Sequence, residues 1–221
     1  MLTLGIDDAG RGPVIGPMVL AGALIDESIE SEFVKLGVRD SKTIVPKKRE
    51  ILAKKIKEHS IAIHIVKISV DEIDGKNNDG LNLNQREAVA SSMIVNKINK
   101  INQPIKVVID CPSVNIKSWK EYLEKLLIGT SNLTVVCEHK ADANHVAVAA
   151  ASILAKVTRD DEIKKLKKQI GVNFGSGYPS DPVTRKFIYE SYEKFKDKGI
   201  FRESWGTIKK HKAHKLQKKL F

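Results

Sequence analysis

Aromatic residues are scarce in this sequence of 221 residues, at 5%, and only two cysteines are present, Cys111 and Cys137. Two cysteines cannot build a disulfide framework, and these two form no CxxC pair of the kind found in zinc ribbons. No apolar run approaches the roughly 20 residues of a membrane-spanning helix, and the N-terminus lacks the basic and apolar regions of a signal peptide. We therefore expect a soluble, cytoplasmic protein with free thiols.

Acidic residues are absent from residues 206–221, a segment that holds six lysines and two histidines. The formal net charge of the whole chain is +11, so this segment carries more than half of the positive excess. An excess of this size indicates a polyanionic partner, with nucleic acid favoured over a membrane surface. The segment itself has two interpretations, an electrostatic arm along a phosphate backbone or a solvated terminal helix.

The order of the apolar segments predicts an α/β fold, in which a hairpin is followed by alternating helices and strands. We expect strands at residues 2–7, 17–24, 60–68, 106–110 and 133–137. We expect helices at residues 29–36, 46–58, 81–99, 115–127, 142–169 and 183–198. These elements predict a mixed sheet flanked by helices, followed by a basic C-terminal helical extension.

Four aspartates occur at the ends of apolar segments. Asp7 and Asp8 end the first expected strand, Asp110 ends a later one, and Asp142 opens an apolar helix. Strand ends are where sites gather in α/β folds, and clustered carboxylates repel one another unless cations lie between them. Mg²⁺ prefers oxygen ligands, and two such ions can hydrolyse a phosphodiester. The pattern therefore suggests a metal-dependent phosphodiesterase site.

Each aspartate taken alone also has a simpler interpretation. Asp142 is consistent with a helix N-cap, and Asp110 is consistent with a turn residue before Cys111 and Pro112. The Asp7–Asp8 pair precedes a glycine turn and is open to the same explanation. Spacing in the sequence does not show that the four carboxylates meet.

Three polar loops offer candidate binding residues. Gly10, Arg11 and Gly12 combine close backbone approach with a guanidinium that suits phosphate, although a plain turn has the same composition. Ser41 and Lys42 provide a hydroxyl and an ammonium group, in what is equally an ordinary polar loop. Tyr178, in the GSGYP segment at 175–179, is an aromatic that can stack on a sugar or base or pack in a core.

Together these segments resemble the type 2 ribonuclease H family, ribonuclease HII, in its archaeal form. The motifs occur in the family's order: GIDDAGRGPVIGPMV at 5–19, RDSK at 39–42, VVIDCP at 107–112, EHKADANHVAVAAASILAKVTRD at 138–160 and GSGYPSDPVTRKF at 175–187. The resemblance implies an RNase H-like catalytic domain at 1–187 and a basic helical extension at 188–221. The type 3 enzymes share this core but carry an additional N-terminal domain, for which the first expected strand, starting at residue 2, leaves no room.

The resemblance also implies an activity. It implies endonucleolytic cleavage of the RNA strand of RNA–DNA hybrids and incision at ribonucleotides embedded in duplex DNA. A two-metal mechanism with Mg²⁺ or Mn²⁺ would leave 3′-hydroxyl and 5′-phosphate ends. A non-catalytic nucleic-acid binder, with the acids as caps and turns, is the alternative that charge alone leaves open.

By motif position the resemblance assigns roles to individual residues. Asp7, Asp8, Asp110 and Asp142 would be the catalytic, metal-binding carboxylates. Gly10, Arg11 and Gly12 would contact the ribonucleotide 2′-hydroxyl, Tyr178 would stack on the following sugar, and Ser41 and Lys42 would lie near backbone phosphates.

Two features concern cofactor and partners. The family usually has Glu after the first aspartate, and Asp8 is one methylene shorter, which leaves the preference between Mg²⁺ and Mn²⁺ open. We expect a monomer that binds no membrane. The terminal segment 217–221, QKKLF, loosely resembles a sliding-clamp peptide, although a helix end that packs back explains it as well.

Overall fold

The computed structural model describes residues 1–39, 41–100 and 103–218, with only the backbone described for 216–218. Within these ranges the chain forms two compact units. The first contains residues 1–9, 19–67 and 81–158, and the second contains 10–18, 68–80 and the chain from Arg159 onward. The expected domain boundary at residue 187 stays a prediction.

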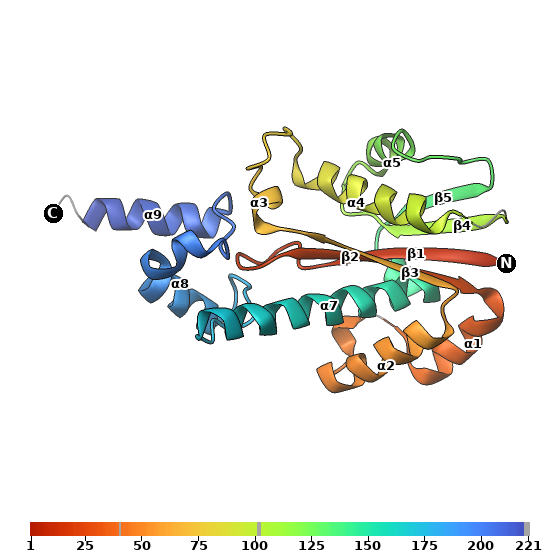
Figure 1. Cartoon of the computed structure of the whole chain (residues 1–221), viewed down its shortest axis with the longest axis horizontal. Helices are drawn as coiled ribbons and strands as arrows, with labels where there is room; N and C mark the ends of the chain where they lie inside the picture. Colours follow the sequence, from red (N-terminus) through yellow and green to blue (C-terminus); the bar gives the residue numbers. More distant parts are fainter. Residues whose placement is uncertain (40, 101–102, 219–221) are drawn as a thin grey trace. The chain divides into compact units, whose positions relative to one another are not determined.

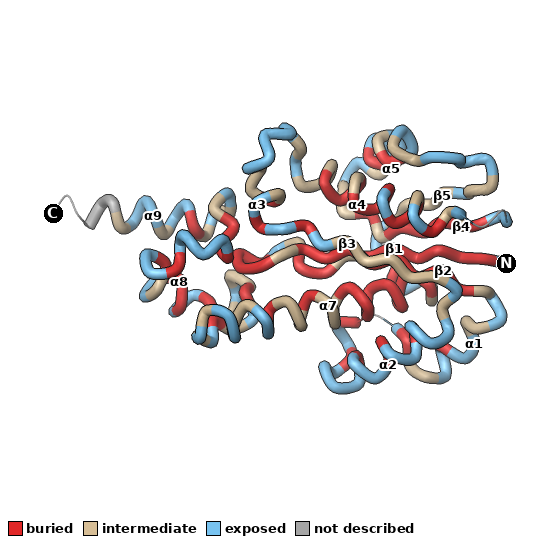
Figure 2. The backbone as a smooth tube through the Cα atoms, viewed as in Figure 1, coloured by how far each residue is buried: buried red, intermediate tan, exposed pale blue. Residues whose placement is uncertain are grey.

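The sheet has five strands in the order β3-β2-β1-β4-β5. Strand β1 is antiparallel to β2 and parallel to β4, and β4 is parallel to β5, so the sheet is mixed as predicted. The strands are β1 (Leu2–Ala9), β2 (Met18–Asp26), β3 (Ala62–Ile68), β4 (Ile105–Asp110) and β5 (Leu133–Glu138). Strands β1 and β2 are buried along nearly their whole length (Figure 2), which matches their continuous apolar sequences.

Helices cover both faces of the sheet in the first unit. Helices α1, α2 and the first half of α7 lie on one face, and α4 and α5 lie on the other (Figure 1). The α-helices are α1 (Glu27–Leu36), α2 (Pro46–His59), α3 (Val70–Ile73), α4 (Leu83–Ile98), α5 (Ile116–Glu124), α6 (Ala141–Asn144), α7 (Val146–Ile170), α8 (Pro182–Phe195) and α9 (Gly206–Lys218). Short 3₁₀ turns cover Ser41–Thr43 and Lys196–Lys198. None of the described helices is long and apolar enough to cross a membrane.

Local sequence explains where several of these helices begin. Asn82 accepts a hydrogen bond from the Gln85 backbone, and the Gln85 side chain bonds back to the Asn82 N–H, which forms a capping box at α4. Pro182 begins α8, and Asp181 caps it by accepting from the Val183 N–H. The expected single helix at 142–169 is interrupted at His145, whose φ of −128° and ψ of 120° are extended. The 142–169 prediction was therefore wrong at this one residue.

The second unit has a core of its own that contains half of the scarce aromatic residues. Four of the six phenylalanines, at positions 174, 187, 195 and 201, are buried there. Phe187 packs against Phe174, Phe195 and Phe201, with ring centroids 5.5 to 5.9 Å apart. Ile208 of α9 is fully buried in the same cluster, so the C-terminal helix is anchored by its first turn. The described part of the basic segment, residues 206–218, is helical, as expected.

Candidate active site

The two central parallel strands bring three of the predicted carboxylates together. Ile6 of β1 pairs with Ile109 of β4, so the next residues on each strand, Asp7 and Asp110, lie side by side at the same edge of the sheet. Asp7, Asp8 and Asp110 line one small cavity of the first unit. The turn explanation is therefore wrong for these residues: all three belong to strands and share a cavity wall.

The same cavity includes an acid that sequence reasoning missed. Glu87 of α4 is 2% exposed and lines the cavity wall, with Ser91 one turn later on the same helix. An Arg–Glu pair within the mostly apolar pattern of α4 was the signal that could have identified it, because acids are seldom placed on a helix face that packs against a sheet.

Burial and mutual repulsion dominate the electrostatics of this cavity. The pKa of Asp7 is raised well above its ordinary value, first by burial and then by the negative charge of Asp8, with Asp110 contributing less. Two groups oppose this effect: Ser152 by its side chain, and the Asp8 backbone N–H, which donates to Asp7 Oδ1 at 2.7 Å. The ionised form of Asp7 is therefore held in an environment that disfavours it.

Asp110 connects this group to the fourth carboxylate. Burial raises the pKa of Asp110, and the charge of Asp142 raises it further. The Ala141 N–H donates to Asp110 Oδ1 at 3.0 Å and lowers this pKa, and the positive charge of Lys42 lowers it as well. The four predicted acids therefore form a row of interacting charges, in which Asp8 acts on Asp7, Asp7 interacts with Asp110, and Asp110 interacts with Asp142.

Asp142 does not cap a helix. It lies inside the short helix α6, whose N-cap is Lys140, and it is 8% exposed. The N-cap explanation is therefore wrong, because the break at His145 separates Asp142 from α7. Asp142 also lines a second, larger cavity with Arg39, Thr43, Asn144 and His145.

Carboxylate oxygens are the ligands that Mg²⁺ and Mn²⁺ prefer, and the raised pKa values of Asp7 and Asp110 show a repulsion that a cation would relieve. The donor set therefore fits divalent ions. Within residues 1–39, 41–100 and 103–218, no three His, Cys, Asp or Glu side chains converge closely enough to enclose one ion. The carboxylates lie at one edge of the sheet, but they do not converge on a single metal position.

Ser41 and Lys42 lie in this unit as well. Ser41 is buried, and its Oγ lies 2.9 Å from Ser152 Oγ on α7. Because Ser152 is hydrogen-bonded to Asp7, Ser41 is linked to that carboxylate through one intervening hydroxyl. Lys42 acts on Asp110 through its charge. Their predicted proximity to substrate phosphates stays a prediction.

The glycine-rich loop and Tyr178 belong to the second unit, where they lie together. Gly10 has a φ of +93°, a backbone conformation that favours glycine, and a Cβ on Gly12 would lie 3.8 Å from the Tyr178 ring. The guanidinium of Arg159, which is 1% exposed, lies 5.2 Å from the centre of that ring and donates to Ser176 O at 2.8 Å. Sequence reasoning missed Arg159, because it begins the charged run RDDEIKKLKKQ of α7, which has the composition of a solvent-exposed helix.

A family profile described as Ribonuclease HII matches residues 4–208 of this chain. The chain belongs to the ribonuclease HII family. A Ribonuclease HII of Thermococcus sibiricus is 45% identical over 218 residues, which cover 97% of this chain and 92% of the relative. The Ribonuclease HII of Methanobrevibacter smithii is 40% identical and covers 96% of this chain and 99% of its own length. Ribonuclease HII enzymes are metal-dependent nucleases, so this chain is a metal-dependent endoribonuclease of the ribonuclease H type.

Solved structures agree with this assignment. The ribonuclease H2 of Pyrococcus horikoshii has a TM-score of 0.84 at 39% identity, covering 97% of this chain and 98% of its own. The ribonuclease HII in a PCNA complex from Archaeoglobus fulgidus has a TM-score of 0.81 at 36% identity, covering 93% and 95%. A Bst-RNase HIII solved with Mn²⁺ has a TM-score of 0.79 at 24% identity, which shows a shared fold; it covers 96% of this chain and 70% of its own. These likenesses confirm the predicted RNase H-like fold.

Proposed function

We propose that this ribonuclease HII cleaves the RNA strand of RNA–DNA hybrids and incises duplex DNA at single embedded ribonucleotides, leaving 3′-hydroxyl and 5′-phosphate ends. The observation that carries the proposal is the gathering of Asp7, Asp8 and Asp110 on one cavity wall, with Asp142 interacting through Asp110. A protein that only binds nucleic acid gains nothing from a cluster of carboxylates that repel one another. A nuclease that uses divalent ions needs such a cluster to bind them.

Each group of residues has a distinct part in the proposed reaction. Asp7, Asp8, Asp110 and Asp142 would hold two divalent ions, which when bound would activate a water and stabilise charge on the leaving oxygen. Gly10, Arg11 and Gly12 would read the 2′-hydroxyl, the group that distinguishes RNA from DNA. Tyr178 lies against Gly12 and would stack on the next sugar, and Lys42 would contribute positive charge near the phosphate.

The direct test is cleavage of a DNA duplex that contains one ribonucleotide, assayed with Mg²⁺, with Mn²⁺ and with EDTA. We expect one incision 5′ to the ribonucleotide with either metal and none with EDTA. An all-DNA duplex of the same sequence is the control and should remain intact. Cleavage of the all-DNA duplex, or binding of the ribonucleotide duplex without incision, would contradict the proposal.

Asp8 gives a prediction about the metal. Because Asp is one methylene shorter than the usual Glu, its carboxylate reaches less far, and Mg²⁺ tolerates irregular geometry less well than Mn²⁺ does. We expect Asp8→Glu to raise kcat with Mg²⁺ several-fold and to change kcat with Mn²⁺ little. Titration of initial rates with each metal measures this ratio, and Asp71→Glu at an exposed position is the matched control. Mg²⁺ activity in the natural enzyme that equals or exceeds that of Asp8→Glu would disprove it.

Helix α9 gives a prediction about substrate affinity. Lys212 pairs with Glu203 and Lys215 with Glu193, whereas Lys209 and Lys210 are exposed. We expect substitution of Lys209 and Lys210 by Gln to raise KM more than it lowers kcat, and to reduce the slope of log K against log salt by about 2, close to one per lost phosphate contact. Truncation after Trp205 should act in the same direction, but it also removes the buried Ile208.

The control for these lysines is substitution of Lys54 and Lys57 by Gln, because both are exposed on α2 and the net charge falls equally. Binding is measured by fluorescence anisotropy on an uncleavable all-DNA duplex from about 50 to 200 mM salt, the range over which phosphate contacts change affinity most. An unchanged slope in the α9 variant would show that this helix does not contact the backbone.

A sliding clamp is a further candidate partner of the enzyme. The related structure from Archaeoglobus fulgidus is a complex of PCNA with a ribonuclease HII. The clamp-like segment 217–221 of this chain lies outside the residues whose side chains are described. Support for this part of the proposal therefore comes from the related complex and the sequence alone.

A further inference from the structure

Arg202 is a fully buried cation whose side chain donates three hydrogen bonds to one loop. Its guanidinium donates to the carbonyl oxygens of Gly10 at 2.7 Å, Arg11 at 2.9 Å and Gly16 at 2.9 Å. The side chain is among the largest in the protein with no solvent exposure. A buried charge is tolerated when dipoles compensate it, so these three carbonyls and Arg202 hold each other in place.

Trp205 holds the next carbonyl of the same loop, that of Gly12. Its indole Nε1–H donates to the carbonyl of Gly12 at 3.3 Å, and its ring lies 5.0 Å from the Arg202 guanidinium. The carbonyls of three consecutive residues, 10 to 12, are therefore held by side chains from 202–205. Backbone bonds reinforce the attachment, since the Arg202 N–H donates to Val14 O at 2.9 Å and the Gly16 N–H donates to Ile200 O at 2.9 Å.

The direction of these carbonyls determines the direction of the neighbouring N–H groups. In a trans peptide the C=O of one residue and the N–H of the next point to opposite sides, and the described chain has no cis peptide bond. With the carbonyls of Gly10 and Arg11 facing Arg202, the N–H groups of Arg11 and Gly12 point to the opposite side of the loop. N–H groups that point to this side of the loop can donate hydrogen bonds to a hydroxyl group placed there.

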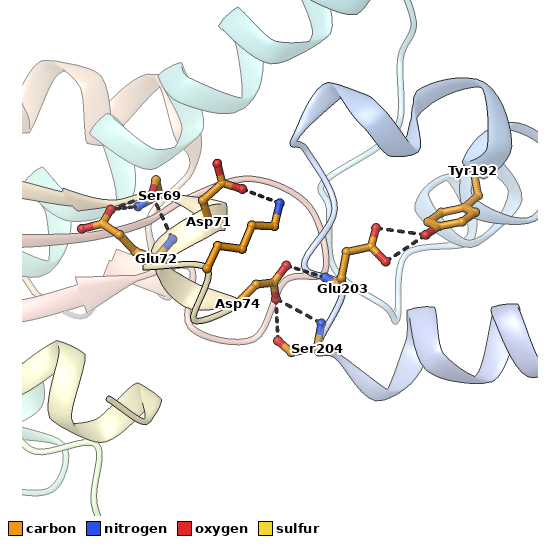
Figure 3. A network of polar contacts seen from close by, with 8 residues as sticks. Ser69, Asp71, Glu72, Asp74, Tyr192, Glu203 and Ser204 are labelled. Atoms are coloured by element: carbon orange, nitrogen blue, oxygen red, sulfur yellow. Dashed lines mark hydrogen bonds and ion pairs between the residues drawn. The ribbon is translucent and has the colours of Figure 1, made fainter. Parts of the chain in front are cut away.

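The segment that carries Arg202 is itself fixed within the second unit. Asp74 accepts from the Glu203 N–H at 2.7 Å and the Ser204 N–H at 3.0 Å, and Glu203 accepts from the Tyr192 hydroxyl (Figure 3). These contacts join 202–205 to the 68–80 segment and to α8. The loop is therefore attached to a segment that is itself hydrogen-bonded to two other segments of the second unit.

We propose that Arg202 and Trp205 are positioning residues for the 10–12 loop, and that they set the enzyme's preference for a ribonucleotide over other nucleotides. The inference rests on the proposed role of this loop in reading the 2′-hydroxyl. Arg202 is buried, and the contacts through which both side chains would act are those to the loop carbonyls.

The test uses two DNA duplexes that differ at one nucleotide, which is a ribonucleotide in one and a 2′-deoxy-2′-fluoro nucleotide in the other. Fluorine occupies the hydroxyl position, but it accepts hydrogen bonds from N–H groups much more weakly than a hydroxyl oxygen does, and it donates none. The readout is the ratio of kcat/KM on the two duplexes, measured under single-turnover conditions at a temperature well below the melting point of every variant. A residue that only stabilises the fold lowers both rates together and leaves this ratio unchanged.

We expect Arg202→Met to lower kcat/KM on the ribonucleotide duplex about 100-fold, because displacement of a binding group by about 1 Å has effects of that order. The ratio should fall about 10-fold, and Arg202→Lys should restore part of it, since an ammonium group can still reach one or two carbonyls. Trp205→Phe keeps the ring near Arg202 but removes the N–H, and it should lower the ratio by a few-fold. Arg185→Met, at an exposed position of α8, is the matched control and should leave the ratio unchanged.

Gly12→Ala separates this inference from the proposed function. A Cβ at Gly12 has its nearest neighbour at the ordinary distance of 3.8 Å, so the variant should fold while crowding the ribose-reading surface. If Gly12→Ala lowers the ratio and folded Arg202→Met and Trp205→Phe do not, the positioning role is disproved and the proposed function stands. If Gly12→Ala leaves the ratio unchanged, the loop does not read the hydroxyl and both fail. Should Arg202→Met not fold, Trp205→Phe alone decides.

Discussion

Replacement of Asp7 by Asn should abolish RNA cleavage, with a fall in kcat of at least about 1,000-fold, and should leave hybrid binding intact. Asp7 is the most enclosed of the four proposed catalytic carboxylates, at 6% exposure, and it is adjacent to both Asp8 and Asp110 in their shared cavity. Asn keeps the shape and one oxygen but loses the negative charge that a divalent cation requires. A nucleic-acid binder without catalysis would keep all of its function.

The same substitution should stabilise the protein in metal-free buffer near pH 7. The pKa of Asp7 is raised in the folded protein, chiefly by burial, so the folded state binds this proton more tightly than the unfolded state. The contribution of Asp7 to the free energy of unfolding is therefore highest at acidic pH, and it falls as the pH rises from the unfolded pKa to the folded pKa. At pH values above the unfolded pKa, the buried carboxyl of Asp7 therefore lowers the free energy of unfolding of the natural protein, and Asn removes this loss.

Thermal unfolding with EDTA and with Mg²⁺ measures this effect independently of activity. With EDTA at pH 7, Asp7→Asn should melt at a higher temperature than the natural protein. Added Mg²⁺ should raise the melting temperature of the natural protein more than that of the variant, since an ion that binds only the folded state stabilises it by mass action. Asp71→Asn, at an exposed site, is the control for both measurements. A lower melting temperature for Asp7→Asn would show that the carboxylates do not repel one another.

Strand patterns and strand ends could be predicted from the sequence because they depend on short-range properties. The apolar run before Asp110 indicates a buried strand wherever it lies, and parallel pairing of β1 with β4 then brings Asp7 and Asp110 to one edge. The helix break at His145 was not predicted, because the segment ADANHV at 141–146 contains no Gly or Pro to mark it. Its consequence is local, since it removes Asp142 from α7 and buries it in α6.

Side-chain partners far apart in the sequence were the part that could not be predicted. The placement of Ser41 near phosphates stays a prediction, and nothing in the sequence indicates the contact of its hydroxyl with Ser152, 111 residues away. Arg202 reaches the carbonyl of Gly10 across 192 residues, and nothing in the surrounding FRESW sequence indicates that contact. Such contacts depend on how the helices and strands pack together. They support the predicted site residues from positions that are distant in the sequence.

Gly5→Ala should prevent stable folding, although the substitution adds only one methyl group. Gly5 lies in the middle of β1, between Ala23 of β2 and Val108 of β4. A Cβ there would lie 2.1 Å from the carbonyl carbon of Ala147 and 2.3 Å from the Val148 nitrogen, both backbone atoms of α7. Backbone atoms cannot rotate away as a side chain can, so β1 and α7 would have to separate.

The expected loss of stability is about 4 kcal/mol or more, against a total of about 5–15 kcal/mol for a typical domain. Gly22→Ala in β2 provides a graded comparison, because its Cβ would meet the Cγ2 methyl of Ile94, a side-chain atom and not backbone, and about 1–3 kcal/mol is expected. Gly206→Ala, with no atom within 4 Å, should change stability by less than about 0.5 kcal/mol. Urea unfolding of the three variants measures the series. Because α7 carries Ser152, whose side chain hydrogen-bonds to Asp7, an equal effect at Gly5 and Gly206 would mean that close packing of α7 on β1 does not hold Ser152 beside Asp7.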